Sequence, residues 1–355
     1  MALPFFNHSA RRDQVIAIDL GGRTTKAVLM QRRNDAYVLA RYALADAPAP
    51  QKTFSADVIG EHIKSIVETL EAKTKSVTLA VGVQDLMVRQ AEMPQLMLQD
   101  MRLVLKTSPK TYLQQDYPNH IFDCYILPTK VPAKADDKAK LNMSQKFKVL
   151  VTGAKKQYVE DMTAAVAKAE LKADGIVPGI IGPINSFEAA NADLFHKSIV
   201  ALVDIGFKSS TICILQEGEL VLSRVVGIGG DKITGGLAEN MAISYAEAEG
   251  IKMGMPAEVQ PILEALVAPL GRELRASVDF FEHQQEKQVS HIFVSGGSSR
   301  SEFVVKILES ELMMPCQTWN PGTAFQLALP PHQMAEVDQV IPHLTVAMGA
   351  AIAEL

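Results

Sequence analysis

The chain has 355 residues, of which 48% are hydrophobic and 21% charged; this composition is typical of an ordinary globular protein, and the length predicts two domains. A net charge of −5 argues against a general nucleic-acid binder, which would carry a basic face. The N-terminus does not resemble a signal peptide, no apolar run approaches the roughly 20 residues that cross a bilayer, and three widely spaced cysteines without CxxC spacing favour a reducing cytoplasm.

Residues 15–30, VIAIDLGGRTTKAVLM, predict a strand, a tight polar turn and a second strand, and a third strand, YVLAR, ends at Arg41. Glycines let a backbone approach a ligand closely, and successive N–H groups in such a turn form a nest for anions. The hydroxyls of Thr24 and Thr25 and the charge of Lys26 add to this donor set. Asp19 would repel a phosphate unless a cation stood between them, so it predicts Mg²⁺ held through water.

The middle of the chain alternates helices and strands. Near its centre, the polar segment 129–148 has a net charge of +4, which suits a solvated loop or an electrostatic contact with acidic headgroups or a partner. The expected elements are an amphipathic helix over 57–74, two strands within 76–92, a helix within 97–116 that breaks before Pro109, a hairpin formed by 121–128 and 146–153, and a helix over 157–171.

Residues 200–215, VALVDIGFKSSTICIL, repeat the opening hairpin, and a further strand, LVLSR, ends at Arg224. In this alignment Asp204 falls on Asp19, Gly206 on Gly21, Ser209 on Thr24 and Ser210 on Thr25. Two hairpins of one design predict two similar domains that face each other, with two phosphate-binding turns that clamp a nucleoside triphosphate. The sequence contains no GxxxxGK[ST] loop, so this is not a P-loop protein.

Three later segments fit the same site. Gly229 and Gly230 precede a helical stretch and could bring a backbone N–H to a phosphate. Glu249 and Lys252, at i and i+3 of a helix, could bind ribose hydroxyls or form a surface ion pair. Residues 291–303, HIFVSGGSSRSEF, predict a strand, a glycine turn and a helix start, and a helix over 343–355 ends the chain.

The phrases IDLGGRTTKAVL, VDIGFKSSTICIL, GIGGDKIT followed by AEAEGIK, and FVSGGSS resemble the actin-like ATPases, and within them the PilM family of type IV pilus assembly. The resemblance implies an α/β fold of two actin-like, ribonuclease-H-like domains with an inserted subdomain of the FtsA and PilM type. The implied division is residues 1–75 with 151–194 for the first domain, 76–150 for the insertion and 195–355 for the second domain.

The implied function is an ATP-binding scaffold at the inner membrane that binds the cytoplasmic tail of a PilN-like bitopic membrane protein. Cofactors would be ATP or ADP with Mg²⁺, and membrane contact would come only through the partner; the resemblance also allows self-association. The expected metal residues are Asp19 and Asp204, through water. The expected nucleotide contacts are Gly21, Gly22, Arg23, Thr24, Thr25, Lys26, Gly206, Phe207, Lys208, Ser209, Ser210, Gly229, Gly230, Glu249, Lys252, Met253, Gly296, Gly297, Ser298 and Arg300.

Two departures from the family pattern concern chemistry. Where actin-like enzymes keep a catalytic acid or amide, in the segment that links the domains, this chain has Gly182, with Glu188 as a downstream substitute. Met253 stands where chaperones of the superfamily have a basic residue, and could stack the adenine together with Arg300. Slow or absent ATP hydrolysis is therefore expected. The alternatives are a filament-forming cytoskeletal ATPase and a small-molecule kinase of the same superfamily.

Overall fold

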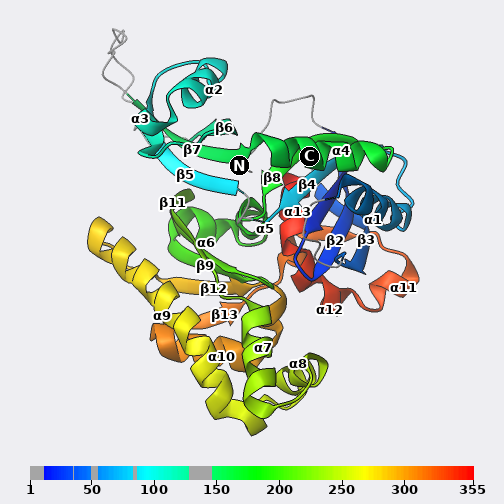
Figure 1. The fold of residues 1–355 in the computed structure, drawn as a ribbon, viewed down its shortest axis with the longest axis vertical. Helices are drawn as coiled ribbons and strands as arrows, with labels where there is room; N and C mark the ends of the chain where they lie inside the picture. The colour runs from blue at the N-terminus through cyan, green and yellow to red at the C-terminus, as the bar shows by residue number, and fades with distance from the viewer. Residues whose placement is uncertain (1–11, 35, 49–54, 83–85, 128–145) are drawn as a thin grey trace.

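The computed structural model describes residues 12–34, 36–48, 55–82, 86–127 and 146–355. Its strands form three sheets, of six, five and three strands, here called the first, second and small sheets. Figure 1 shows the first and second sheets side by side, with the small sheet at one end of the molecule. Most of the lysine-rich segment expected as a loop lies outside the described residues.

The first sheet has the strand order β14-β3-β2-β1-β4-β8. Strands β1, β2 and β3 form antiparallel pairs; β4 and β8 continue the sheet in parallel beyond β1, and β14 pairs with β3 in parallel. The bounds are β1 (Gln14–Leu20), β2 (Thr24–Arg33), β3 (Ala36–Asp46), β4 (Ser76–Val81), β8 (Lys172–Pro178) and β14 (Phe325–Leu327).

Helices cover both faces of the first sheet because its strands alternate two sets of apolar side chains. Ile16 and Ile18 pack with residues of α1 and α4, whereas Val15 and Ala17 pack with α13. These helices span α1 (Ala56–Glu68), α4 (Lys156–Lys168) and α13 (Thr345–Ile352); α5 (Ile181–Ala190), which links the halves, packs against α13. The predicted helices over 57–74, 157–171 and 343–355 are confirmed with shorter bounds.

The second sheet, β11-β10-β9-β12-β13, repeats the arrangement of the first: an antiparallel hairpin with a third strand, then parallel strands. This confirms the duplication that the repeated hairpin predicts. Its strands are β9 (Ile199–Ile205), β10 (Ser210–Gln216), β11 (Glu219–Val226), β12 (His291–Ser295) and β13 (Cys316–Thr318).

The helices of the second half are α6 (Ala192–Lys197), α7 (Gly230–Met241), α8 (Tyr245–Gly254), α9 (Gln260–Gln285) and α10 (Glu302–Leu312). The long helix α9 was not predicted from the sequence. Its buried residues Leu263, Val267, Leu270 and Leu274 pack in one core with strand residues of the second sheet.

The small sheet has the order β5-β7-β6, with all pairs antiparallel. Its strands β6 and β7 form the predicted hairpin, and the predicted helix break before Pro109 is present between α2 and α3. The bounds are β5 (Leu86–Pro94), β6 (His120–Ile126), β7 (Lys146–Lys155), α2 (Leu98–Thr107) and α3 (Pro109–Leu113).

Three of the expected domain boundaries differ from the sheet pairing. Strand β7 pairs with β5 and β6 beyond residue 150, so the insertion ends at Lys155. Strand β4 pairs with β1, so it belongs to the first sheet and the insertion begins after Val81 rather than at residue 76. The chain also returns to the first half at its end, because β14 pairs with β3 and α13 packs on β1. Residues from 325 onward are therefore part of the first half. Sequence periodicity could not show this, because a buried helix of small residues fits either half.

Short helical segments complete the described chain: η1 (Pro256–Val259), η2 (Gly297–Arg300), η3 (Pro321–Ala324), α11 (Pro331–Met334), α12 (Val337–Val340) and η4 (Ile341–Leu344). Among the residues with described placement, no helix has both the length and the apolar character needed to cross a bilayer.

Candidate functional site

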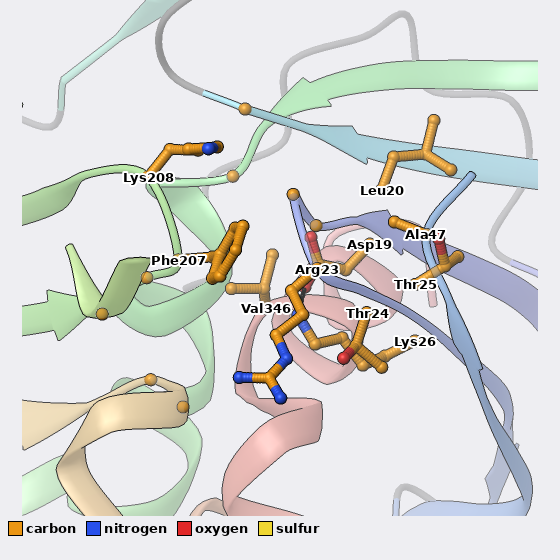
Figure 2. Close-up of a pocket in the computed structure, with 18 of the residues that line it drawn as sticks. Asp19, Leu20, Arg23, Thr24, Thr25, Lys26, Ala47, Phe207, Lys208 and Val346 are labelled. Carbon is orange, nitrogen blue, oxygen red and sulfur yellow. Dashed lines mark hydrogen bonds and ion pairs between the residues drawn. The ribbon is translucent and has the colours of Figure 1, made fainter. Parts of the chain in front are cut away.

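A cleft of about 960 Å³ lies between the first and second sheets, and both hairpin turns line it. Figure 2 shows residues of the β1–β2 turn facing Phe207 of the β9–β10 turn. The structure brings together every expected site residue except Ser210 and Gly229, which do not line the cleft. Residues from five separate stretches of the chain thus converge on one cavity of a size suited to a small-molecule ligand.

The β1–β2 turn holds a lysine and an aspartate opposite each other. Asp19 and Lys26 are register partners, and the Lys26 ammonium lies 2.9 Å from Asp19 Oδ2. Burial alone would lower the pKa of Lys26, but the charges of Asp19 and Asp204 and the hydrogen bond to Asp19 raise it. A Cβ on Gly21 would lie 2.5 Å from the Thr24 carbonyl oxygen, so only glycine fits this turn.

The β9–β10 turn is supported from behind by helix α7. Gly206 N–H donates to the Ser209 carbonyl, and the carbonyls of Gly206 and Phe207 accept from the N–H groups of Gly230 and Asp231. The first N–H groups of α7 therefore bond the carbonyls of the turn. They are not free to bind a phosphate, which corrects the expectation from the sequence. Gly229 packs directly against the backbone of the turn: a Cβ there would lie 2.7 Å from the Gly206 carbonyl oxygen, so this position requires glycine.

Two aspartates, Asp19 and Asp204, line the cleft and lie close enough for their charges to interact. Asp204 accepts a hydrogen bond from Ser295 Oγ at 2.9 Å. Burial raises the pKa of Asp204, and the charge of Asp19 raises it further, while the Ser295 hydrogen bond and Lys26 oppose the shift. Two crowded carboxylates beneath two donor-rich turns suit a hard cation that keeps its water shell. No larger His, Cys, Asp and Glu cluster occurs among the described residues.

Two hydroxyls of the aligned hairpins do not face the cleft in the expected way. Ser210 is fully buried and its hydroxyl donates to the Ile228 carbonyl at 2.7 Å, which corrects its assignment as a phosphate donor. Thr25 lines the cleft on the side of α1, where its Oγ1 lies 2.8 Å from Nε2 of His62. Thr211, which sequence reasoning missed, lines the cleft in place of Ser210. Strand alternation is the signal that could have distinguished neighbours at 210 and 211.

Helix α8 presents a buried network to the cleft. The ammonium of Lys252, 3% exposed, donates to Glu249 Oε2 at 2.7 Å and to Thr234 Oγ1 at 2.8 Å. Glu249 Oε2 also accepts from Thr234 at 2.6 Å. Burial would raise the pKa of Glu249, but hydrogen bonds from Lys252 and Thr234 and the charges of Lys252 and Arg23 lower it, so the carboxylate is ionised at neutral pH. The surface-pair alternative is therefore wrong for these two residues.

The glycine turn after β12 closes the far side of the cleft. Gly296 has φ of +91°, and a Cβ there would lie 2.5 Å from the Ile205 carbonyl oxygen, so the turn requires glycine. Arg300, at the end of η2, lies 3.2 Å from Nε2 of His343, which belongs to the returning C-terminal segment. Burial and the charge of Arg300 lower the pKa of His343 to about 4, so it is neutral. His343 was missed because the chain's return was not expected.

The linking helix α5 turns its polar residues away from the cleft. A Cβ on Gly182 would lie 2.5 Å from the Val346 carbonyl oxygen, so this position packs on the α13 backbone. Asn185 donates to the Gly349 carbonyl, and Glu188 is buried with its carboxylate 3.5 Å from His196. None of the three lines the cleft, and the expectation that Glu188 substitutes for the family's acid has no geometric support.

The cleft continues past the β1–β2 turn toward the junction with the small sheet, a region that sequence reasoning also missed. This extension is lined by α1, α4 and the end of β4. Its residues are Ser55, Val58, Ile59, Val81, Gly82, Tyr158 and Met162. Thr25 and Lys26 are neighbours in β2 and therefore point to opposite faces of the sheet: Thr25 faces α1 and the extension, and Lys26 faces Asp19.

Comparison with known proteins gives one match over almost the whole chain. A family model described as "Type IV pilus assembly protein PilM" matches residues 17–355. Among curated proteins, the cell division protein FtsA of Bacillus subtilis is 32% identical over 103 residues, which are 29% of this chain and 22% of FtsA. The ethanolamine utilization protein EutJ of Escherichia coli is 28% identical over 145 residues, 41% of this chain and 46% of EutJ. These matches cover less than half of either relative.

Solved structures share the fold. A PilM–PilN type IV pilus biogenesis complex has a TM-score of 0.79 at 18% identity and covers 98% of this chain and 100% of that one. MreB 5 of Spiroplasma citri bound to AMPPNP has a TM-score of 0.55 at 11% identity, with 97% of each chain covered. EutJ of Carboxydothermus hydrogenoformans has a TM-score of 0.55 at 13% identity, with 99% of this chain and 92% of EutJ covered. These likenesses establish the actin-like fold that the sequence predicts.

Proposed function

The chain belongs to the PilM family of type IV pilus assembly proteins, and from that premise we propose that it is a nucleotide-binding scaffold for the cytoplasmic tail of a PilN-like membrane protein. The observation that carries the nucleotide part is the convergence of two glycine-bearing turns, Lys26 and the buried Glu249–Lys252 pair on one cleft. ATP or ADP would place its phosphates between the turns and its ribose at Glu249.

Magnesium fits the two aspartates that line the cleft. Asp19 and Asp204 would hold the ion through water, and the bound ion would screen the phosphates from both carboxylates. Lys26 already supplies one positive charge beside Asp19, so this chain's own residues provide charge for the phosphates with or without metal.

Titration calorimetry with ADP and ATP, with and without Mg²⁺, tests this binding. Lys26→Ala should weaken ADP binding by roughly tenfold or more, because a charge-assisted contact to phosphate is lost. Lys64→Ala is the matched control: Lys64 lies on the exposed side of α1, where it pairs with Glu170. Equal affinities for wild type and Lys26→Ala would contradict this placement of the phosphates.

Slow hydrolysis is the second part of the proposal. Hydrolysis requires a group that positions or deprotonates water, and losing such a group typically costs 10²–10⁴-fold in rate. The polar residues of α5 face α13 or His196 instead of the cleft. Turnover below roughly 1 s⁻¹ in a phosphate-release assay would agree with this. Gly182→Glu is not an informative variant because a side chain there would collide with the α13 backbone.

The partner would dock where the cleft extends between α1, α4 and the small sheet. A solved relative contains PilM together with PilN. An extended peptide satisfies its backbone by pairing with a strand edge and inserts alternate side chains into pockets. In this chain β5 and β6 are the outer strands of the small sheet, and Ile59 and Met162 offer apolar walls. Membrane contact would come through the partner.

A fluorescent peptide from the cytoplasmic tail of the PilN-like protein tests the docking site. Val58→Glu places a charge in the extension and should weaken peptide binding by at least tenfold while ADP binding persists. Val58 is 37% exposed, so the variant should fold. Val225→Glu, at a similarly exposed valine on β11, is the control and should bind the peptide normally. Unchanged binding by Val58→Glu would move the docking site elsewhere.

A further inference from the structure

Arg23 spans the cleft from the first half of the molecule to the second. It sits at the tip of the β1–β2 turn, where its carbonyl accepts from Ala47 N–H at 2.8 Å. Its side chain reaches into the middle of the cleft (Figure 2), and its Nη1 lies 3.2 Å from Glu249 Oε1 on α8. The guanidinium of Arg23 is thus paired with the same carboxylate that the proposed ribose contact requires.

Glu249 does not need Arg23 to be held in place. Its Oε2 accepts from both Thr234 and Lys252, which belong to the same half of the molecule. Arg23 contacts the other oxygen, Oε1, from across the cleft. A ligand hydroxyl that binds Glu249 must therefore compete with the guanidinium for Oε1.

The pair between Arg23 and Glu249 is easily exchanged. The Arg23 side chain is 49% exposed, and a pair of this kind changes an equilibrium constant by less than about fivefold. A phosphate carries more negative charge and accepts a guanidinium through two parallel hydrogen bonds. The equivalent residue of the second turn, Lys208, instead pairs with Asp231 of its own half at 2.6 Å. The cross-cleft contact is therefore peculiar to the first turn.

We propose that Arg23 selects ligands that carry phosphates. Without ligand, Arg23 is paired with Glu249. When a nucleoside di- or triphosphate binds, the guanidinium moves to its phosphates, and the Glu249 carboxylate becomes available to the ribose hydroxyls. A nucleoside without phosphates displaces Arg23 and offers it no new partner. The proposal rests on nucleotide binding in this cleft and adds a specificity-determining residue to it.

Calorimetry with ADP and with adenosine separates the two roles of Arg23. In Arg23→Ala, ADP binding should weaken roughly 10- to 100-fold, whereas adenosine binding should stay the same or tighten up to about fivefold. Arg23→Lys keeps the charge without the two-pronged geometry and should lie between wild type and Arg23→Ala for ADP. Arg33→Ala, at an exposed arginine that bonds Gln31 outside the cleft, should match wild type for both ligands.

Each other outcome has a defined meaning. Equal weakening of ADP and adenosine by Arg23→Ala would show that Arg23 merely supports the site, and unchanged ADP affinity would show that it does not meet the phosphates; either result overturns the proposal. A wild-type protein that binds no ADP would overturn the proposed nucleotide function itself. Melting curves of both Arg23 variants establish that the fold is intact, and Arg23→Lys carries the test if Arg23→Ala unfolds.

Discussion

In the hairpin of the first sheet, the aspartate that ends the first strand faces a lysine across the turn; in the hairpin of the second sheet, the equivalent Asp204 faces Thr211 and accepts from Ser295. The second turn is also supported by α7, whose first N–H groups bond its carbonyls. The first turn instead accepts a bond at its tip from Ala47 N–H. One sequence pattern therefore specifies two similar backbones, whereas neighbouring elements decide the charge and rigidity of each.

The difference suggests a division of labour. The first hairpin carries two cations that line the cleft, Lys26 and Arg23, whereas the second turn is held by hydrogen bonds from α7. Lys208, the only cation of the second turn, is already paired with Asp231. The following substitutions test whether rigidity belongs to the second turn and charge to the first.

The largest expected effect is on the support of the second turn. Gly229→Ala would place a Cβ 2.7 Å from the Gly206 carbonyl oxygen, in a position surrounded by backbone that cannot yield. We expect a loss of about 3 kcal/mol or more in the free energy of unfolding. At the tip of the first turn, Gly22→Ala would meet the side chains of Phe207 at 3.4 Å and Lys208 at 3.5 Å, which are ordinary contacts, and should cost less than about 1 kcal/mol. Similar losses in chemical denaturation would contradict the contrast.

The second effect is on metal-dependent binding. Asp19→Ala should weaken ADP binding in the presence of Mg²⁺ by roughly 10- to 100-fold, and should weaken metal-free binding less, because Lys26 then meets the phosphate without competition from the carboxylate. Asp204→Ala should show the same metal dependence. Calorimetry with Mg²⁺ and with a chelator measures the two affinities, and equal losses under both conditions would remove the aspartates from the metal site.

The third effect separates two neighbouring serines. Ser210→Ala removes the donor to the buried Ile228 carbonyl and should lower the free energy of unfolding by about 1–2 kcal/mol. Ser209→Ala, at the cleft, should leave stability unchanged and weaken ADP binding instead. If Ser210→Ala folds normally and loses more ADP affinity than Ser209→Ala, the original assignment of Ser210 as a phosphate donor would be restored.

Much of this arrangement could be predicted from the sequence, and the failures have physical reasons. Strand–turn–strand patterns with Asp and Gly are local, so the duplicated hairpins and the converging cleft residues were found. The return of residues 325–355 to the first half depends on contacts far apart in the chain, such as Asn185 with Gly349, which no local pattern reveals. The partners of Arg23 and Ser210 were missed for the same reason: a side chain's bond depends on which element folds against it.

The smallest effect concerns the two aligned aspartates themselves, which should respond to neutralisation with opposite signs. Asp204 has a pKa raised above its ordinary 3.8 by burial and by the charge of Asp19. The folded state therefore binds the proton more tightly than the unfolded state, and the free energy of unfolding falls as pH rises through the interval between 3.8 and the raised pKa. Asp204→Asn removes this penalty while its side-chain oxygen can still accept from Ser295.

In a chelator and without nucleotide, Asp204→Asn should thus be more stable than wild type at pH 7, by about 1 kcal/mol. The advantage should shrink as the pH falls toward 3.8, where the wild-type carboxyl becomes protonated. Asp19→Asn should instead destabilise the protein at pH 7, because Lys26 loses its partner. Melting temperatures of the three proteins between pH 4 and pH 7 measure both trends. Destabilisation by both substitutions at pH 7 would mean that the charge of Asp204, like that of Asp19, stabilises the folded protein through Lys26. The two hairpins would then differ less than their hydrogen bonds indicate.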